Sequence, residues 1–250
     1  MPSVAGAALL AGAGVVAGIV GTAGGITTLV SYPALLLAGA PPLAASVSNT
    51  VAVVACWPGA ALSSRPELAG RWRWLFRWSG VAVLGGIAGA VLLLTTPPGL
   101  FARIVPFLLA GGSVALVAQS RLRPTEARLG GVTPWLLALG LFLTSLYNGY
   151  FGAGSGVLTL VLLLVLVERG LIQANALKNM VIGVASIVSA ATFVLFARVR
   201  WLDVVPLALG LFVGSLLGPV VARRLPSWLL RWAVALMGLG FAIRLWVAPG

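Results

Sequence analysis

Long apolar segments separated by short polar turns dominate the pattern along this chain of 250 residues. A helix needs about 20 predominantly apolar residues to cross the ~30 Å hydrocarbon core of a bilayer. Segments of that length lie near residues 43–63, 74–95, 100–119, 174–197, 203–222 and 227–247. Arginine, proline and tryptophan residues gather at their ends, as expected for turns at a membrane surface. The pattern predicts an all-α polytopic membrane protein.

Two further apolar stretches, 4–39 and 133–168, have a different length. Each would be roughly 50 Å long as a straight helix, which is too long for one span and short for two. Glycine clusters interrupt both stretches, GTAGG at 21–25 and GAGSG at 152–156. Because glycine frees the backbone to turn, we expect each stretch to form a hairpin of two short helices that enters the membrane and returns.

The two halves of the chain repeat the same landmarks in the same order. A series of glycines that begins at Gly18 recurs from Gly149, at an offset of 131 residues. The motif Arg-Trp-Leu at 73–75 likewise recurs at 200–202. The repeat predicts a duplication with halves 1–128 and 129–250, each containing one glycine-broken hairpin and three transmembrane helices.

The basic residues favour an inverted relation between these halves. If each hairpin returns to its own side, each half crosses the membrane an odd number of times. Arg103, Arg198, Arg200 and Arg244 then lie toward one face, and the other twelve of the 16 basic residues lie toward the opposite face. Treating each broken stretch as one span gives a weaker split of 10 to 6. Because cytoplasmic loops are enriched in Lys and Arg, we predict inverted repeats with a cytoplasmic 120–131 loop and both termini outside.

Composition narrows the classes of function. Hydrophobic residues make up 60% of the chain and charged residues only 8%, far below the roughly 25% of a soluble domain. The net charge of +12 is spread over inter-helix turns, so we expect no nucleic-acid partner. Histidine is absent, cysteine occurs once and there are four acidic residues, none deep in a predicted span. We therefore expect no metal, no cofactor and no enzymatic reaction, and the bilayer is the expected environment.

The glycine clusters are candidate binding elements for a small anion. Where a helix begins at a break, its first amide N–H groups lack partners and its dipole favours negative charge. Inverted repeats with broken helices are typical of secondary transporters, which bind substrate near the midplane. The alternative is that the glycines only permit close helix packing. The candidate residues at the clusters are Thr22, Gly24, Gly25, Gly154, Ser155 and Gly156.

Polar pairs near the start of the following helices complete the candidate site. Ser48-Asn49 in the first half corresponds to Lys178-Asn179 in the second. Asparagine is costly in an apolar helix and generally faces the interior of a bundle. Lys178, the single lysine, either neutralises a bound anion or extends its ammonium to the lipid headgroups.

These motifs resemble the sulfite exporter TauE/SafE family, also called toluene sulfonate uptake permeases. The segments that carry the resemblance are GIVGTAGGITTLVSYPALLLAG, PPLAASVSNTV, GYFGAGSGVLTLVLLL and ALKNMV. The resemblance implies a multi-pass secondary transporter of sulfite, sulfonates or sulfoacetate in a bacterial inner membrane. It leaves the exact substrate, the direction, the coupling ion and the oligomeric state open.

Three other classes of function remain as alternatives. A channel would need a continuous polar path, whereas the polar residues gather at one level. A membrane-embedded hydrolase would need Ser155 as nucleophile with Lys178 as base. A scaffold subunit would carry no solute flux.

Overall fold

The computed structural model describes residues 4–119, 134–168, 170–224 and 227–247, and all regular elements in these ranges are helices. They are α1 (Val4–Gly24), α2 (Thr27–Leu37), α3 (Pro42–Val53), α4 (Cys56–Ser63), α5 (Arg65–Leu68), α6 (Trp72–Thr95), α7 (Pro98–Gln119), α8 (Pro134–Tyr150), α9 (Ser155–Leu166), α10 (Leu171–Phe196), α11 (Trp201–Arg224) and α12 (Ser227–Val247). The chain is an all-α polytopic membrane protein, as its hydrophobic pattern predicts.

Six of the described apolar segments are long enough to cross a membrane, and five of them coincide with predicted spans. The five are Pro42–Leu62, which joins α3 and α4, with Trp72–Thr95, Pro98–Ala118, Leu171–Phe196 and Trp201–Gly218. The sixth is Ala5–Thr22 in α1. The remaining predicted span, 227–247, is α12, whose described apolar part covers Val234–Trp246.

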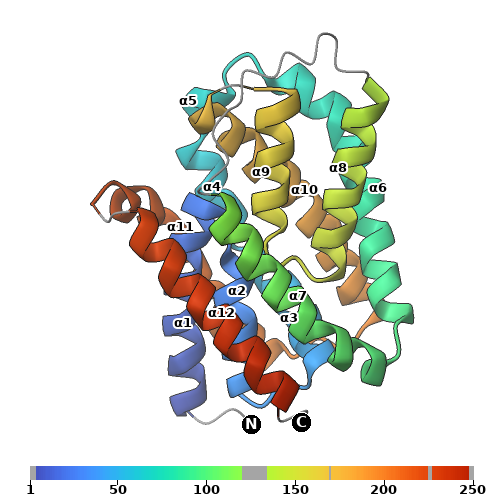
Figure 1. Ribbon diagram of the computed structural model, residues 1–250, viewed down its shortest axis with the longest axis vertical. Coiled ribbons are helices and arrows are strands. Elements are labelled where there is room, and N and C mark those ends of the chain that lie inside the picture. Colours follow the sequence, from blue (N-terminus) through green and yellow to red (C-terminus); the bar gives the residue numbers. More distant parts are fainter. Residues whose placement is uncertain (1–3, 120–133, 169, 225–226, 248–250) are drawn as a thin grey trace.

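The two broken stretches form the pairs α1–α2 and α8–α9. Helix α1 has 21 residues and is not short, whereas α2 has 11, α8 has 17 and α9 has 12. In Figure 1, α1 rises from the lower end of the molecule and α2 returns toward it, while α8 descends from the upper end and α9 returns upward. The turns of the two hairpins thus approach each other from opposite ends. An inverted symmetry of halves 1–128 and 129–250 stays a prediction.

The backbone breaks differently in the two hairpins. In the first, helix α1 continues to Gly24, and only Gly25 (φ +71°) and Ile26 separate it from α2. The Gly25 amide still donates to the Gly21 carbonyl at 2.7 Å, so most of the GTAGG cluster is helical and not unwound as predicted. In the second, residues 151–154 are non-helical, with positive φ at Gly152 and Gly154.

Close glycine contacts attach each hairpin to the other half of the chain. A Cβ on Gly18 of α1 would lie 2.5 Å from the Leu211 carbonyl oxygen of α11. A Cβ on Gly85 of α6 would lie 2.6 Å from the Phe142 carbonyl oxygen of α8. Small residues let membrane helices approach to backbone contact. The pairs α1–α11 and α6–α8 therefore fix the first arm of each hairpin against a helix of the opposite half.

Candidate functional site

A cavity lies where the two hairpin turns meet. It offers about 80 Å³ to the centres of water-sized groups. A single water needs roughly 10–15 Å³ by this measure, so the space suits several waters or one small polyatomic group. Its lining residues come from α1, α2, the α3–α4 segment, α8, α9 and α10: Gly21, Thr22, Gly25, Thr27, Thr28, Val53, Val54, Cys56, Trp57, Ala60, Asn148, Gly152, Ser155, Gly156, Lys178, Asn179, Ile182, Gly183 and Ser186.

The N-termini of α2 and α9 both face this cavity. Thr27 and Thr28 form the first turn of α2, and Ser155 and Gly156 begin α9. The hydrogen bonds recorded around the second turn use the amides of Ser155, Val157 and Leu158, and among the described residues they give the Gly156 amide no acceptor. Helix N-termini carry partial positive charge and unpaired N–H donors. Two such termini at one cavity favour a negatively charged occupant.

Glycine brings the two turns into direct contact. A Cβ on Gly156 would lie 2.5 Å from both the Cα and the carbonyl oxygen of Gly25. Conversely, a Cβ on Gly25 would lie 2.8 Å from the Gly156 Cα and 3.3 Å from the Lys178 Nζ atom. Real Cβ atoms do not approach backbone this closely. The glycines at these two positions therefore let the hairpins meet beside Lys178.

Lys178 supplies a cation at this meeting point. Its side chain is 1% exposed, and Nζ donates to Asn175 Oδ1 at 2.7 Å. The ion pairs of the described residues are Arg71–Glu168 and Arg200–Asp203, so no carboxylate there pairs with Lys178. The side chain is directed into the bundle and does not extend to headgroups. That the lysine neutralises a bound anion stays a prediction.

Neutral hydrogen-bonding groups surround the lysine. Asn148 Nδ2 donates to Ser186 Oγ at 3.0 Å, while its Oδ1 accepts from Ser155 Oγ at 2.8 Å. Ser155 Oγ also lies 2.8 Å from the Gly152 carbonyl oxygen. The Asn179 side chain lines the cavity, and no described residue forms a hydrogen bond with it. Ser155 and Lys178 each bond to other groups, and the hydrogen bonds of the described residues do not join them to each other.

Trp57 is a cavity residue that the sequence reasoning missed. Its indole nitrogen is buried and has no hydrogen-bond partner among the described residues. The ring lies against Gly183 of α10, where any Cβ would collide with it. The available signal was position, because Trp57 falls inside an apolar span whereas Trp72 and Trp201 mark helix ends. An unpaired N–H is costly to bury, so the indole is a further group that can donate a hydrogen bond to a ligand in the cavity.

The residues predicted from the sequence differ in whether they line the cavity. Thr22, Gly25, Ser155, Gly156, Lys178 and Asn179 line the cavity, although the Thr22 hydroxyl donates to the Gly18 carbonyl of its own helix. Ser48, Asn49 and Gly154 are not among the lining residues, and the surroundings of Gly24 lie outside what the structure describes. Gly24 ends α1, and Gly154 precedes α9 with φ +77°, where a Cβ would lie 2.9 Å from Gly112 Cα of α7.

Ser48 and Asn49 connect elements behind the cavity. Ser48 Oγ accepts a hydrogen bond from the Arg200 amide at 3.2 Å. Asn49 Oδ1 accepts from Ser31 Oγ at 2.5 Å, and its Nδ2 donates to Thr28 Oγ1 at 3.3 Å. Since Thr28 lines the cavity, Asn49 holds the start of α2 from behind.

Comparison with known proteins gives this architecture a family. The family model described as "Sulfite exporter TauE/SafE" matches residues 5–245. The chain belongs to the sulfite exporter TauE/SafE family. Two similar curated proteins are a "Probable membrane transporter protein ORF9" of Sinorhizobium sp and a "Probable membrane transporter protein" of Haemophilus influenzae. The first is 25% identical over 94% of this chain and 90% of its own length, and the second is 24% identical over 92% and 90%. As a TauE/SafE protein, the chain is a multi-pass membrane transporter.

Proposed function

We propose that this protein is a secondary transporter of small sulfur-containing anions, of the sulfite, sulfonate or sulfoacetate type, in a bacterial inner membrane. The substrate binds in the cavity between the hairpin turns. One observation carries the proposal: Lys178 is 1% exposed and faces two helix N-termini, and no described carboxylate pairs with it. The family membership supports the sulfur oxyanion class.

The electrostatics of the cavity favour an anion over a cation or a neutral solute. A buried charge is stable only when it is paired or well hydrogen-bonded. The lysine has one neutral acceptor, Asn175, while the free amide of Gly156 and the indole N–H of Trp57 are donors. An oxyanion accepts hydrogen bonds on every oxygen and compensates the ammonium at the same time. A cation would meet like charge and a shortage of acceptors.

The architecture favours a transporter over a channel. The hairpins reach the cavity from opposite ends of the molecule (Figure 1) and touch through Gly25 and Gly156. Broken helices that meet at a midplane site are the usual arrangement in secondary transporters, where movement of one unit against the other exposes the site alternately. Single-channel conductance in planar bilayers would contradict this assignment.

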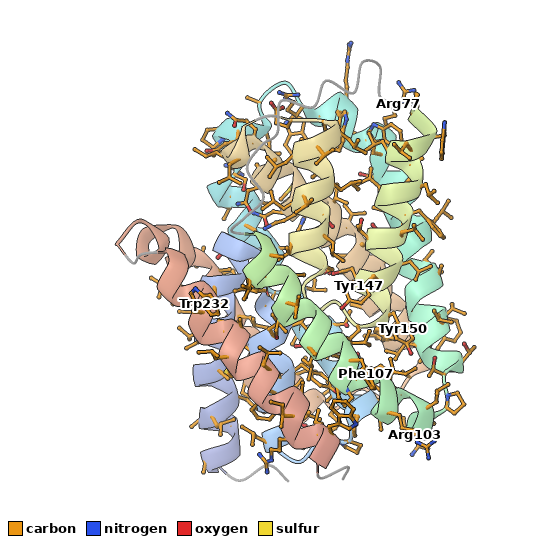
Figure 2. The ribbon with its side chains drawn as sticks, viewed as in Figure 1. Arg77, Arg103, Phe107, Tyr147, Tyr150 and Trp232 are labelled. Atoms are coloured by element: carbon orange, nitrogen blue, oxygen red, sulfur yellow. The ribbon has the colours of Figure 1, made fainter. Side chains whose placement is uncertain are left out.

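The charges at the two ends accord with a membrane-spanning orientation. Figure 2 shows Arg77 at the upper end of the molecule and Arg103 at the lower end. They belong to the two faces that the basic-residue pattern separates. The face with more arginine is the proposed cytoplasmic side.

Binding and flux measurements on the purified protein test the proposal. Sulfite, methanesulfonate and sulfoacetate are titrated by calorimetry in detergent, and their uptake into proteoliposomes is measured in parallel. Lys178→Gln should weaken binding about 10- to 150-fold, since a lost hydrogen bond to a charged group costs roughly 1.5–3 kcal/mol. Arg244→Gln is the matched control, because it removes the same charge from α12, at a residue that does not line the cavity. Absence of binding for all three anions, or unchanged affinity in Lys178→Gln, would refute the proposed site.

A further inference from the structure

The surroundings of Lys178 raise the question of what balances its charge when the cavity holds no anion. Helix α10 packs against α3, α4, α5, α6, α8 and α9. Neither α3 nor α9 carries a titratable side chain; the others carry Cys56 on α4, Arg65 and Glu67 on α5, Arg73 and Arg77 on α6, and Tyr147 and Tyr150 on α8. Of these, Cys56 alone lines the cavity.

None of these groups supplies a negative charge at the lysine. The Cys56 thiol lies 3.6 Å from the Leu211 carbonyl oxygen, to which it donates. The Tyr147 hydroxyl donates to the Ala153 carbonyl at 2.7 Å. Glu67 belongs to α5, outside the residues that line the cavity. Within the described chain, Asn175 Oδ1 is the acceptor recorded for Nζ, and it is uncharged.

The free energies of the charged species in this cavity depend on one another. An ammonium alone bears the full cost of removing a charge from water, and an anion alone bears the same cost. Together they attract strongly, because the low-dielectric surroundings strengthen the interaction between charges. Each charge therefore makes the other less costly, which is a linkage between proton binding and anion binding.

We propose that the anion and a proton bind together in this cavity, with the proton carried on Lys178 Nζ, so that transport is coupled to the proton gradient. This inference rests on the proposed function and adds the coupling ion to it. The proton comes from water and joins the lone pair of the neutral amine. It leaves to water when the anion leaves.

Charge balance gives this coupling a distinct signature. A monovalent anion moving with one proton transfers no net charge. Its flux follows the pH difference across the membrane and does not respond to the electrical potential. A fixed positive charge at the same position would bind the anion without taking up a proton, and the anion would then cross carrying its own charge.

Proton uptake on binding is the direct test. Methanesulfonate is the probe, because its sulfonate stays ionised across the neutral range whereas sulfite itself gains protons there. Calorimetric titrations in buffers with different ionisation enthalpies report the number of protons taken up per anion. We expect about one proton per anion under conditions in which the empty protein is neutral at this site, with affinity falling about tenfold for each unit of rising pH.

Variants assign the proton to its site. Lys178→Arg keeps a permanent positive charge, so it should bind methanesulfonate with no proton uptake and no pH dependence. Cys56→Ser removes the other titratable group of the cavity and should retain the uptake. In proteoliposomes, uptake by the wild-type protein should follow an imposed pH gradient and ignore a potassium diffusion potential.

The possible failures are distinguishable from failure of the proposed function. Binding by the wild-type protein without proton uptake would overturn the coupling while leaving the anion site standing. Uptake that persists in Lys178→Arg, or disappears in Cys56→Ser, would move the proton to another group and overturn the assignment to Lys178. If Lys178→Arg does not fold, the buffer-dependence of the wild-type protein still decides whether a proton is taken up.

Discussion

Asn49 in the first half and Asn179 in the second occupy corresponding positions in the sequence repeat, and the structure gives them different surroundings. Both side-chain ends of Asn49 are engaged, by Ser31 and Thr28 of α2, and the residue is 1% exposed. The side chain of Asn179 lines the cavity without a hydrogen-bond partner among the described residues. The same amide therefore braces a helix in one half and lines the cavity in the other.

The two hairpin turns also differ between the halves. The first turn stays helical through Gly24, whereas the second is open over residues 151–154. Asn148 joins Ser155 and Ser186 at the second turn, but the residue at the corresponding place before the first turn is Ala17. Likewise, the residue that corresponds to Lys178 in the sequence of the first half is Ser48. The comparison indicates that the second half supplies the lysine and the asparagine amides of the cavity, whereas the first half supplies the start of α2 and the Trp57 indole.

The largest expected effect comes from filling the contact between the two turns. Gly156→Ala places a methyl group 2.5 Å from the Gly25 backbone, which cannot yield as a flexible side chain does. Overpacking of this kind costs about 1–3 kcal/mol or more, and it also separates the walls of the cavity. We expect a lower unfolding temperature in detergent and loss of methanesulfonate binding.

A matched substitution isolates the contact from the change in helix propensity. Gly111→Ala on α7 meets nothing within 4 Å and should be neutral or slightly stabilising. Normal stability and normal binding in Gly156→Ala would show that the turns are not in contact in the binding-competent protein.

Asn179→Ala should mainly reduce affinity. Its amide has no described partner to abandon, so its removal costs the folded protein little. Losing one hydrogen bond to a charged ligand should weaken methanesulfonate binding about 10- to 150-fold. Calorimetry and thermal unfolding on the same preparation separate the two quantities. A large loss of stability with unchanged affinity would assign Asn179 a structural role instead.

Asn49→Ala should show the opposite pattern. Removing this amide deprives Ser31 and Thr28 of buried partners, which costs about 1–3 kcal/mol of stability. Affinity in the folded fraction should change much less than in Asn179→Ala, because no atom of Asn49 lines the cavity. Equal losses of affinity in the two variants would remove the distinction between the halves.

The sequence was sufficient for the helices and for part of the cavity. Apolar length predicted the spans because a bilayer requires it, and the repeat singled out Gly25, Gly156, Lys178 and Asn179, which the structure brings to one place. The sequence predicted a helix break over the whole GTAGG cluster, but the helix continues through most of it. Glycine permits a turn without requiring one, and here the hydrogen bond from the Gly25 amide to the Gly21 carbonyl keeps the helix intact. Trp57 and Ser186 were missed, because which face of a span meets the cavity depends on packing between distant helices.

The smallest expected effect concerns the ion pair at the end of the second hairpin. Arg71 and Glu168 join the start of α6 to the residues after α9, with side chains 41% and 17% exposed. Exposed pairs contribute about 0–1 kcal/mol, so Glu168→Gln should shift stability slightly and change methanesulfonate flux by less than about twofold.

The other described ion pair is the matched comparison. Asp203 is 1% exposed and bonds Arg200 Nε at 2.5 Å. Asp203→Asn should therefore destabilise the protein more, because a buried group loses its charged partner. Neither carboxylate lines the cavity, and proteoliposome flux driven by a pH gradient tests both. Loss of that flux in Glu168→Gln, with the protein still folded, would make this carboxylate a proton carrier and contradict a transport cycle in which Lys178 holds the proton.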